Sequence, residues 1–180
     1  MTLLLHACCG PCSVYVVESL RERGAGFVSY FYNPNIHPYT EYQRRLDTLR
    51  LFALSTGVDL RVHPEYRPED YFRAVTGREE ERCALCYRIR MEKTAATARD
   101  LGCEAFSTTL LYSRHQKHDL LRETCQAVAR ESGVPFHYED FRVGWSRGVA
   151  ESRRLGMYRQ QYCGCLYSER ERFLGASPPG

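Results

Sequence analysis

Six of the nine cysteines fall into three close pairs, and thiol groups at such spacings can bind metal ions. The pairs are Cys8-Cys9, Cys83-x-x-Cys86 and Cys163-x-Cys165. Thiolate sulfur binds zinc and iron–sulfur clusters well. The cysteine count is odd and no signal peptide is recognisable, which disfavours the disulfide framework of a secreted protein. The pattern therefore predicts reduced thiolates gathered around metal in a cytoplasmic protein.

A third cysteine, Cys12, follows the first pair within the segment Cys-Cys-Gly-Pro-Cys-Ser. Gly10 permits a sharp turn, and Pro11 and Ser13 suit the start of a helix. The N-terminus of a helix stabilises negative charge and lowers the pKa of cysteine thiols. We expect metal ligands here, and a Cys9-x-x-Cys12 redox dithiol is the alternative.

The other two pairs differ in geometry. Cys83 and Cys86 open a predicted helix, where the i, i+3 spacing places both sulfurs on one face. That spacing fits a zinc knuckle, a redox pair or one arm of a cluster. Gly164, between Cys163 and Cys165, favours a turn in which both sulfurs reach one metal or two neighbouring metals.

The elements that must position these cysteines alternate between strands and helices. Apolar runs predict strands at residues 3–6, 27–32, 59–63, 104–108 and 135–138. Helical periodicity predicts helices between the first two strands and over residues 41–55, 83–101 and 117–132. Such alternation predicts an α/β fold with a mainly parallel sheet and Rossmann-like, nucleotide hydrolase-like βαβ units. The cysteine-rich metal site is expected at the carboxyl ends of the strands.

Two cysteines outside the pairs are predicted to be apolar core residues. Cys125 lies on the apolar stripe of its helix, and Cys103 precedes an apolar strand. At 20.9 kDa the chain is expected to form one domain over residues 1–175, followed by a frayed tail at 176–180. No stretch approaches 18 apolar residues, so no membrane association is expected.

Basic residues are almost all arginine, since only Lys93 and Lys117 are lysine among 25. Seven arginines lie between Arg142 and Arg172, where glutamate occurs only three times. The planar guanidinium suits phosphates and stacks on bases, so the last third of the chain is a candidate RNA-binding surface. A compositional bias that acts on solvated faces is the alternative, and the net charge of +3 does not by itself indicate nucleic acid.

Several further motifs occur between and around the cysteines. In chain order the whole set is Leu5-His6-x-Cys8-Cys9-x-Pro11-Cys12, Phe31-Tyr32-Asn33-Pro34-Asn35-Ile36-His37-Pro38, Glu41-Tyr42, Cys83-x-x-Cys86-Tyr87-x-x-Arg90, Ser107-Thr108-Thr109-Leu110-Leu111, Tyr138-Glu139-Asp140-Phe141-Arg142 and Tyr158-Arg159-Gln160-Gln161-Tyr162-Cys163-Gly164-Cys165. This ordered set resembles the QueH family of epoxyqueuosine reductases from the first strand to Ser168. A series of spaced motifs is far more specific than any single Cys-x-x-Cys.

The resemblance implies an oxidoreductase for the last step of queuosine tRNA modification. In that step the epoxide of epoxyqueuosine, at the wobble position of a tRNA anticodon, loses its oxygen to give an alkene. The reaction takes two electrons and two protons and does not use cobalamin. The resemblance also implies a 4Fe-4S cluster with an adjacent single metal ion, expected to be iron, and an electron donor as a second partner.

The family motifs also imply roles for individual residues. The matching ligand positions are Cys8, Cys9, Cys83, Cys86, Cys163 and Cys165, and Cys12 is added to the predicted metal-binding set. Cys8, Cys12, Cys163 and Cys165 are further predicted to be catalytic. The expected substrate contacts are Tyr32, Asn33, Asn35, His37, Glu41, Thr108, Thr109, Arg142, Arg159, Gln161 and Tyr162. Some relatives have Asp in place of Cys12, so Cys12 is either an equivalent ligand or a neighbour of the metal.

Other classes of protein compete with this interpretation. The principal alternative is a zinc-stabilised RNA-binding module without redox chemistry. An ATP-dependent tRNA thiolase of similar architecture would need a glycine-rich pyrophosphate loop after the first strand, where this chain has cysteines instead. A thiol-disulfide oxidoreductase would use only Cys9 and Cys12 and leaves the other two pairs unexplained. One segment, residues 113–118, departs from the Ser-Pro-aromatic run expected in the family.

Overall fold

A four-stranded parallel sheet forms the centre of the computed structural model, which describes residues 2–175. The strands are β1 (Thr2–His6), β2 (Gly26–Phe31), β3 (Leu60–Val62) and β4 (Ala105–Thr108). They pair in the order β3-β2-β1-β4, and all pairs are parallel. The predicted α/β class with a parallel sheet is thus confirmed. The predicted tail, 176–180, lies outside the described residues.

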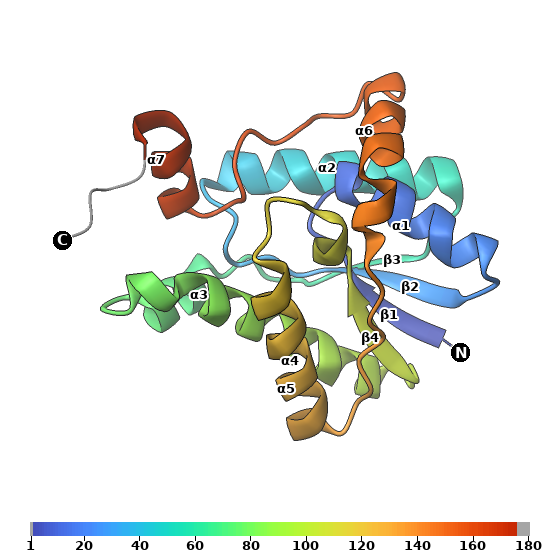
Figure 1. The fold of residues 1–180 in the computed structure, drawn as a ribbon, viewed down its shortest axis with the longest axis horizontal. Coiled ribbons are helices and arrows are strands. Elements are labelled where there is room, and N and C mark those ends of the chain that lie inside the picture. The colour runs from blue at the N-terminus through green and yellow to red at the C-terminus, as the bar shows by residue number, and fades with distance from the viewer. Residues whose placement is uncertain (1, 176–180) are drawn as a thin grey trace.

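Helices cover both faces of the sheet (Figure 1). They are α1 (Gly10–Glu22), α2 (Tyr39–Thr56), α3 (Pro68–Val75), α4 (Arg82–Asp100), α5 (His118–Ser132), α6 (Trp145–Arg154) and α7 (Leu166–Leu174). One face carries α1, α2 and α6, and the other carries α4 and α5. None of the helices within residues 2–175 combines the length and the apolar character needed to cross a membrane.

The predicted fifth strand, residues 135–138, is wrong. The segment makes one parallel bridge, between Phe106 and Phe136. Phe106 N–H donates to the Pro135 carbonyl over 2.9 Å, and His137 N–H donates to the Phe106 carbonyl over 2.8 Å. Pro135 has no N–H to extend the ladder. The Tyr138 hydroxyl instead lies 3.1 Å from His118 Nε2 on α5, so the chain has already left the sheet.

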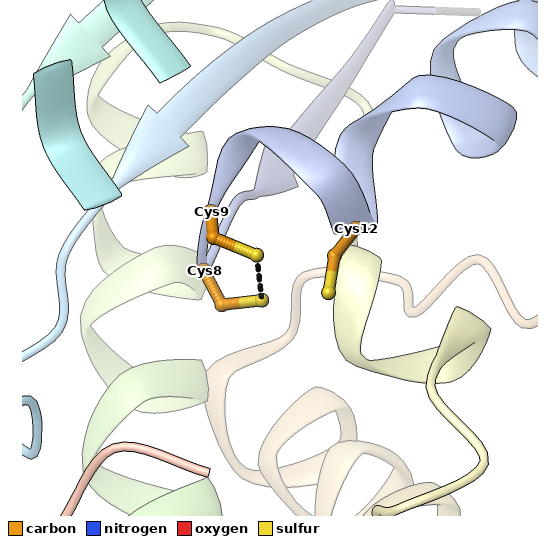
Figure 2. Close-up of side chains that lie close together, drawn as sticks. All are labelled: Cys8, Cys9 and Cys12. Atoms are coloured by element: carbon orange, nitrogen blue, oxygen red, sulfur yellow. Dashed lines mark hydrogen bonds between the residues drawn. The ribbon is translucent and has the colours of Figure 1, made fainter. Parts of the chain in front are cut away.

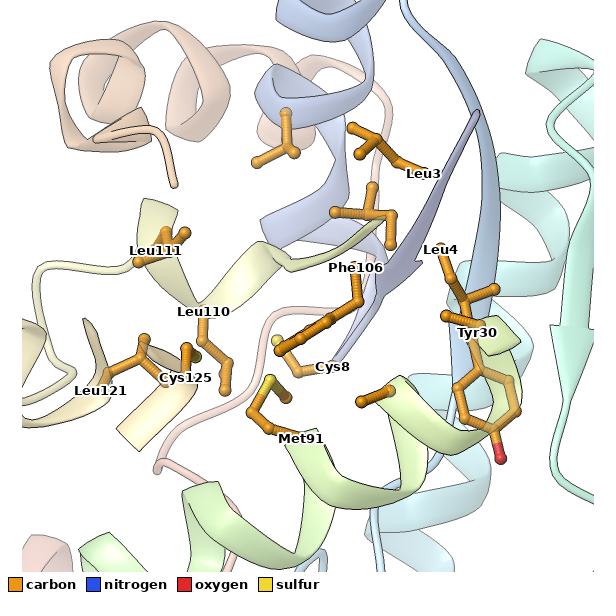
Figure 3. Packing of buried hydrophobic residues seen from close by; sticks show 14 of the residues in the cluster. Leu3, Leu4, Cys8, Tyr30, Met91, Phe106, Leu110, Leu111, Leu121 and Cys125 are labelled. Atoms are coloured by element: carbon orange, nitrogen blue, oxygen red, sulfur yellow. The ribbon is translucent and has the colours of Figure 1, made fainter. Parts of the chain in front are cut away.

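The strand β1 is enclosed on both faces, which explains its uninterrupted apolar sequence. Leu3, Leu4 and Leu5 are fully buried. On the face of α4 and α5, Met91 and Phe106 belong to the same apolar cluster (Figure 3). A second cluster fills the space between the sheet and the helices α1 and α2. This two-sided core holds the carboxyl end of β1 in a fixed position.

The order of the strands reverses between β1 and β4. After β1 the chain enters α1, and it returns to β2 on one side. After β4 it enters a 3-10 turn (Thr109–Tyr112), and the following helix α5 covers the opposite face. Open α/β sheets bind ligands at such switch points, outside the carboxyl ends of the strands. Cys8 and Thr109, which follow β1 and β4, meet there, with Cys8 N–H donating to Thr109 Oγ1 over 3.2 Å.

Two glycines let α6 approach its neighbours closely. A Cβ atom at Gly144 would lie 2.2 Å from the ring of Tyr15 on α1. A Cβ atom at Gly148 would lie 2.4 Å from the Tyr112 hydroxyl. Since the helix carries few apolar residues, its sequence pattern did not predict it. Close packing between these glycines and the two tyrosines fixes its place instead.

We expect Gly144→Ala to lower the free energy of unfolding by roughly 1–3 kcal/mol, because the added methyl group overpacks the contact with Tyr15. Urea denaturation measures the effect. Ser146→Ala, an exposed position on α6, is the control and should leave the midpoint unchanged. Equal midpoints for the two variants would show that the close approach of α6 does not contribute to stability.

Candidate metal centre and adjoining cavity

Three cysteine sulfurs converge where β1 passes into α1 (Figure 2). Cys8 follows β1, Cys9 is the N-cap residue of α1, and Cys12 lies in its first turn. All three side chains are buried, and their sulfurs lie within 4.8 Å of one another. The Cys8 and Cys9 sulfurs are 3.7 Å apart. This group, called the thiol trio below, is compact enough to hold one metal ion.

Hydrogen bonds favour negative charge on the thiol trio. Hydrogen bonds from Cys12 and Cys9 hold the pKa of Cys8 well below its ordinary value. Burial raises the pKa of Cys9, whose sulfur accepts a hydrogen bond from Gln160 Nε2 over 3.1 Å. Thr109 Oγ1 lies 3.6 Å from the Cys8 sulfur. Hydrogen bonds with Cys8 and Cys9 raise the pKa of Cys12. Cys8 is therefore the member of the trio in which the thiolate is favoured, and metal binding would release the protons of the other two.

His6 ties the ends of three strands together beneath the trio. Its Nδ1 lies 2.9 Å from Thr108 Oγ1, and its Nε2 lies 3.1 Å from the Tyr32 carbonyl. Burial lowers the pKa of His6 to about 4, so the ring is neutral at physiological pH. Since a carbonyl only accepts, Nε2 carries the proton and Nδ1 accepts from the Thr108 hydroxyl. Tyr32 and Thr108, both predicted substrate contacts, are buried in this support.

The remaining four cysteines of the predicted ligand set line a second cavity of about 170 Å³. Cys83 and Cys86 come from the start of α4, while Cys163 and Cys165 come from the segment before α7. Cys165 is the N-cap residue of α7, and its sulfur accepts a hydrogen bond from Ser168 N–H over 3.4 Å. Two helix N-termini thus contribute thiols to one cavity, a placement that stabilises thiolates.

A fully buried arginine accompanies this second group. Arg90 donates to the Cys86 sulfur over 3.2 Å and to the Cys86 carbonyl over 3.1 Å, and its guanidinium lies 5.6 Å from the Tyr87 ring centroid. Within residues 2–175 no carboxylate contacts this guanidinium. Burial raises the pKa of Cys86 to about 12, which Arg90 opposes. A buried cation needs a counter-charge, and cysteine sulfur is the group positioned to supply it.

A cavity of about 130 Å³ opens beside the thiol trio and shares a wall with the four-cysteine cavity. Cys8 and Cys12 line it from the trio, and Cys163 and Gln116 line both cavities. Gln116 Nε2 donates to the Cys163 sulfur over 3.4 Å, and its carbonyl oxygen accepts from the Tyr87 hydroxyl over 2.9 Å. The two cysteine groups therefore lie beside adjoining cavities whose shared lining includes Cys163 and Gln116.

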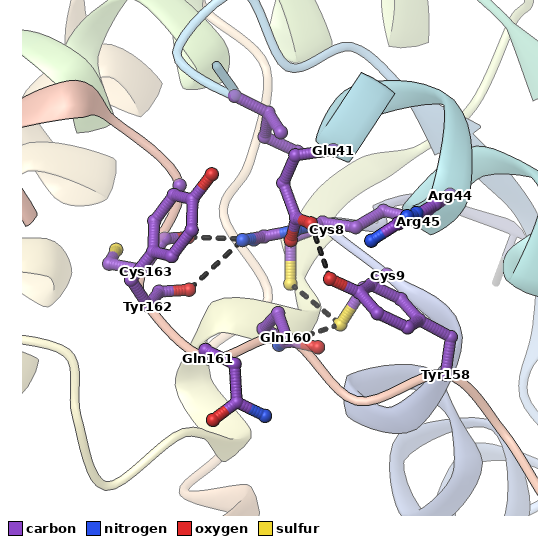
Figure 4. Close-up of polar contacts among 12 residues, drawn as sticks. Cys8, Cys9, Glu41, Arg44, Arg45, Tyr158, Gln160, Gln161, Tyr162 and Cys163 are labelled. Carbon is purple, nitrogen blue, oxygen red and sulfur yellow. Dashed lines mark hydrogen bonds and ion pairs between the residues drawn. The ribbon is translucent and has the colours of Figure 1, made fainter. Parts of the chain in front are cut away.

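A buried ion pair on α2 holds the C-terminal cysteine segment in place (Figure 4). Arg45 donates to Glu41 Oε1 over 2.7 Å, to the Cys163 carbonyl over 2.7 Å and to the Tyr162 carbonyl over 2.9 Å. The Tyr158 hydroxyl donates to the second oxygen of Glu41. In this arrangement the Cys163 side chain points away from Cys8 and Cys9, toward the second cavity.

The predicted substrate loop lies beneath this segment. Asn33 Nδ2 donates to the Ala7 carbonyl over 3.0 Å. His37 is buried, and its N–H donates to the Gly164 carbonyl over 2.8 Å. The carbonyl of His37 accepts from the Tyr162 hydroxyl over 2.5 Å. Asn35 lines the four-cysteine cavity. These residues support the cysteine segment in the structure, and their contact with substrate stays a prediction.

Only some of the other predicted substrate contacts lie at the cavity beside the trio. Arg159 and Tyr162 line the cavity beside the trio, whereas Gln161 is exposed. Arg142 is held by Asp140, with nitrogen–oxygen distances of 2.8 and 2.6 Å, and lies outside the cavity lining.

Four further residues that line this cavity were not among the predicted site residues, namely His115, Gln116, Trp145 and Gln160. Two signals were available for finding them. Residues 113–118 depart from the family pattern, and the chain has only one tryptophan.

The fold and the two cysteine groups define a Rossmann-like α/β protein with a thiol-rich site, able to bind metal, at the switch point of its sheet. The same fold occurs in a predicted subunit of a tRNA methyltransferase from Methanocaldococcus jannaschii. The TM-score is 0.59 at 12% sequence identity, over 85% of this chain and 74% of the other.

The chain belongs to the QueH family, because the model described as epoxyqueuosine reductase QueH matches residues 3–171. An epoxyqueuosine reductase QueH from Dehalococcoides mccartyi is 43% identical over 98% of this chain and 97% of its own length. One from Thermotoga maritima is 36% identical over 95% of this chain and 92% of its own length. The family predicted from the sequence is confirmed.

We expect Arg45→Met to lower the free energy of unfolding by roughly 3–5 kcal/mol, because it leaves Glu41 buried without its partner. It should also release the segment that holds Cys163, seen as faster amide hydrogen exchange over residues 158–163. Arg50→Met, at an exposed position on the same helix, is the control. Slow exchange in the Arg45 variant would show that other contacts hold the segment.

Proposed function

We propose that this protein reduces epoxyqueuosine in the anticodon loop of tRNA to queuosine, and that residues 1–175 act as one reductase domain. Both carbon–oxygen bonds of the epoxide break, two electrons complete the new carbon–carbon double bond, and the oxygen leaves as water with two protons. The observation that carries the proposal is the shared wall, because a cavity open to substrate adjoins a four-thiol site suited to electron transfer.

The four-cysteine cavity fits a 4Fe-4S cluster better than a zinc ion. Tetrahedral zinc, with Zn–S bonds of about 2.3 Å, needs sulfurs about 3.8 Å apart. Among the described residues, the thiol trio is the one group of three or more potential ligands whose atoms all lie within 4.8 Å of one another. The wider spacing of Cys83, Cys86, Cys163 and Cys165 suits a cluster with several irons. The buried Arg90 would offset the charge of such a cluster.

The thiol trio fits the adjacent single metal ion, which we take to be iron. The 3.7 Å separation of the Cys8 and Cys9 sulfurs matches two ligands of one tetrahedral ion. When bound, the two centres supply low-potential electrons and a Lewis acid for the epoxide oxygen.

The chain itself contributes positive charge and a partly apolar enclosure. Arg159, held by a hydrogen bond to Ser152 Oγ, lines the cavity and can donate to the oxygen as negative charge develops on it. Leu110 and Val149 line the same cavity and limit access of water. A separate electron donor must supply the two electrons, and we place the reaction in the cytoplasm, with tRNA as the partner.

The direct test is anaerobic incubation of the iron-loaded protein with dithionite and an anticodon stem-loop RNA that contains epoxyqueuosine. Mass spectrometry of the nucleosides should show queuosine formed by loss of one oxygen atom. Failure of the loaded wild-type protein to convert this RNA would overturn the proposal.

We expect Cys83→Ser and Cys86→Ser each to abolish the cluster, because a hydroxyl is a far poorer iron ligand than a thiolate. Iron and acid-labile sulfide analysis with an absorption spectrum measures the loss. Cys103→Ser is the matched control, since Cys103 lies in neither cavity and is half-buried. Stoichiometric zinc and no iron in anaerobically purified wild type would favour the zinc-stabilised RNA-binding module instead.

We also expect RNA binding to depend on exposed arginines near the cavity. Arg153 and Arg154 lie at the exposed end of α6. Each phosphate contact that is lost from single-stranded RNA reduces the slope of log affinity against log salt by about 0.7. The double variant Arg153→Ala/Arg154→Ala should therefore have a shallower slope with an unchanged cluster spectrum. Arg61→Ala, on β3, is the control, and a slope equal to that of wild type in the double variant would remove both residues from the RNA-binding surface.

A further inference from the structure

The only tryptophan of the chain lies at the cavity beside the thiol trio. Trp145 is half-buried, and its ring packs on Tyr112 with centroids 5.1 Å apart and planes inclined by 31°. The exposed ring of His115 stands edge-on to it at 5.4 Å and 76°. Arg114 lies 6.0 Å from the same indole centroid. An indole supported from behind and open toward the cavity offers a surface for another flat ring.

The size and lining of the cavity indicate what kind of ring it accepts. Its volume of about 130 Å³ is slightly smaller than that of an engineered cavity of about 150 Å³ that takes up benzene, so it can admit the edge of a flat ring while the rest of the ring stays at its mouth. Cys8 and Cys12 contribute to its lining, and so do Trp145 and His115. The Gln160 amide and the Arg159 guanidinium also face it and can bind the polar edges of a ring. Aromatic surfaces beside amides and guanidinium groups are what single-stranded RNA bases bind.

Packing fixes the indole before any ligand arrives. The Tyr112 hydroxyl donates to the Trp145 carbonyl over 3.0 Å. Gly144 and Gly148, on either side of Trp145, allow the close contacts with Tyr15 and Tyr112 described above. A group already held in its binding position loses little conformational freedom when the ligand binds. The exposed His115 at the rim has no comparable support and can change its rotamer. It must move away from the indole to admit a base, because the 5.4 Å between the two ring centroids is less than two van der Waals contacts of about 3.5 Å each.

We propose that Trp145 stacks on the target base of a single-stranded RNA loop and that His115 covers the second face of that base, holding it beside Cys8 and Cys12. This inference rests on the proposed function and adds the residues that select and orient the substrate. An unpaired base in an anticodon loop can turn toward such a platform at a small unstacking cost. Trp145 and His115 act as positioning residues, while the reaction itself takes place at the cysteine centre.

Intrinsic fluorescence provides the first test, because the indole concerned is the only one in the chain. We expect quenching when the anticodon stem-loop RNA with epoxyqueuosine is added to the loaded protein. The same RNA with an abasic site at the target position should bind through its phosphates and leave the emission nearly unchanged. Equal quenching by the two RNAs would overturn the proposal. No quenching by either RNA would also overturn it.

Binding of fluorescein-labelled stem-loop RNA, followed by anisotropy, provides the second test. Stacking on one base corresponds to a loss of affinity of about 5- to 150-fold when the aromatic ring is removed. Trp145→Ala should lose affinity within this range, and Trp145→Phe should recover most of it. An unchanged affinity of Trp145→Ala, with iron content and unfolding midpoint equal to wild type, would overturn the proposal.

Tyr138→Ala is the matched control. Tyr138 has similar neighbours, with the His118 ring at 5.9 Å and Arg122 at 5.1 Å from its centroid, but it lies outside the cavity lining. We expect this variant to bind RNA like wild type.

Conversion assays separate the stacking proposal from the reductase proposal. If the RNA quenches the fluorescence of the wild-type protein but is not converted by it, the reductase proposal is overturned and the stacking proposal is supported. If Trp145→Ala binds the RNA with wild-type affinity and converts it at the wild-type rate, the stacking proposal is overturned and the reductase proposal is supported.

Discussion

The buried ion pair between Arg45 and Glu41 is the interaction on which the assembly of the site depends. It joins α2, in the first third of the chain, to the segment that contains Cys163. A buried ion pair stabilises a fold only when its remaining hydrogen-bonding groups are satisfied. Here the three guanidinium nitrogens bind Glu41, Tyr162 and Cys163, and the second carboxylate oxygen binds Tyr158. The ion pair on α2 and the segment 158–163 therefore satisfy each other's polar groups, and each needs the other in place.

The cysteines are placed so that the fold offsets the cost of gathering negative charge. Cys9 and Cys165 are N-cap residues of α1 and α7, and Cys83 lies in the first turn of α4. Helix N-termini carry partial positive charge, which favours thiolate over thiol. The two fully buried arginines, Arg45 and Arg90, add a complete positive charge beside each group. Arg45 is already neutralised by Glu41, whereas Arg90 has no carboxylate partner among the described residues, so cysteine thiolate is the group placed to balance its charge.

Support of the cysteine segment and the lining of the cavity beside the trio come largely from different parts of the chain. The loop at 33–37 is buried and contacts the cysteine segment through His37, so in the structure it supports that segment. The surface that meets the cavity comes instead from the turn after β4 and from the start of α6. There a packed tyrosine supports an indole, and an exposed histidine stands at the rim. Rigid support with an open rim is what a site needs to accept a base that must leave its own stack.

The sequence by itself determined the α/β class, the parallel sheet and the family, and it singled out the seven cysteines that gather in the structure, because periodicity and motif spacing are local properties. The tertiary structure decided how the cysteines divide. Cys83 and Cys86 join Cys163 and Cys165 across about half the chain, and that pairing depends on chain crossovers which local spacing does not encode. The tertiary structure also shows that residues 135–138 make one isolated bridge instead of the predicted strand, where Pro135 cannot donate a ladder hydrogen bond. Trp145 became part of the cavity lining only through the packing of α6, a short and strongly polar helix that its sequence pattern did not predict.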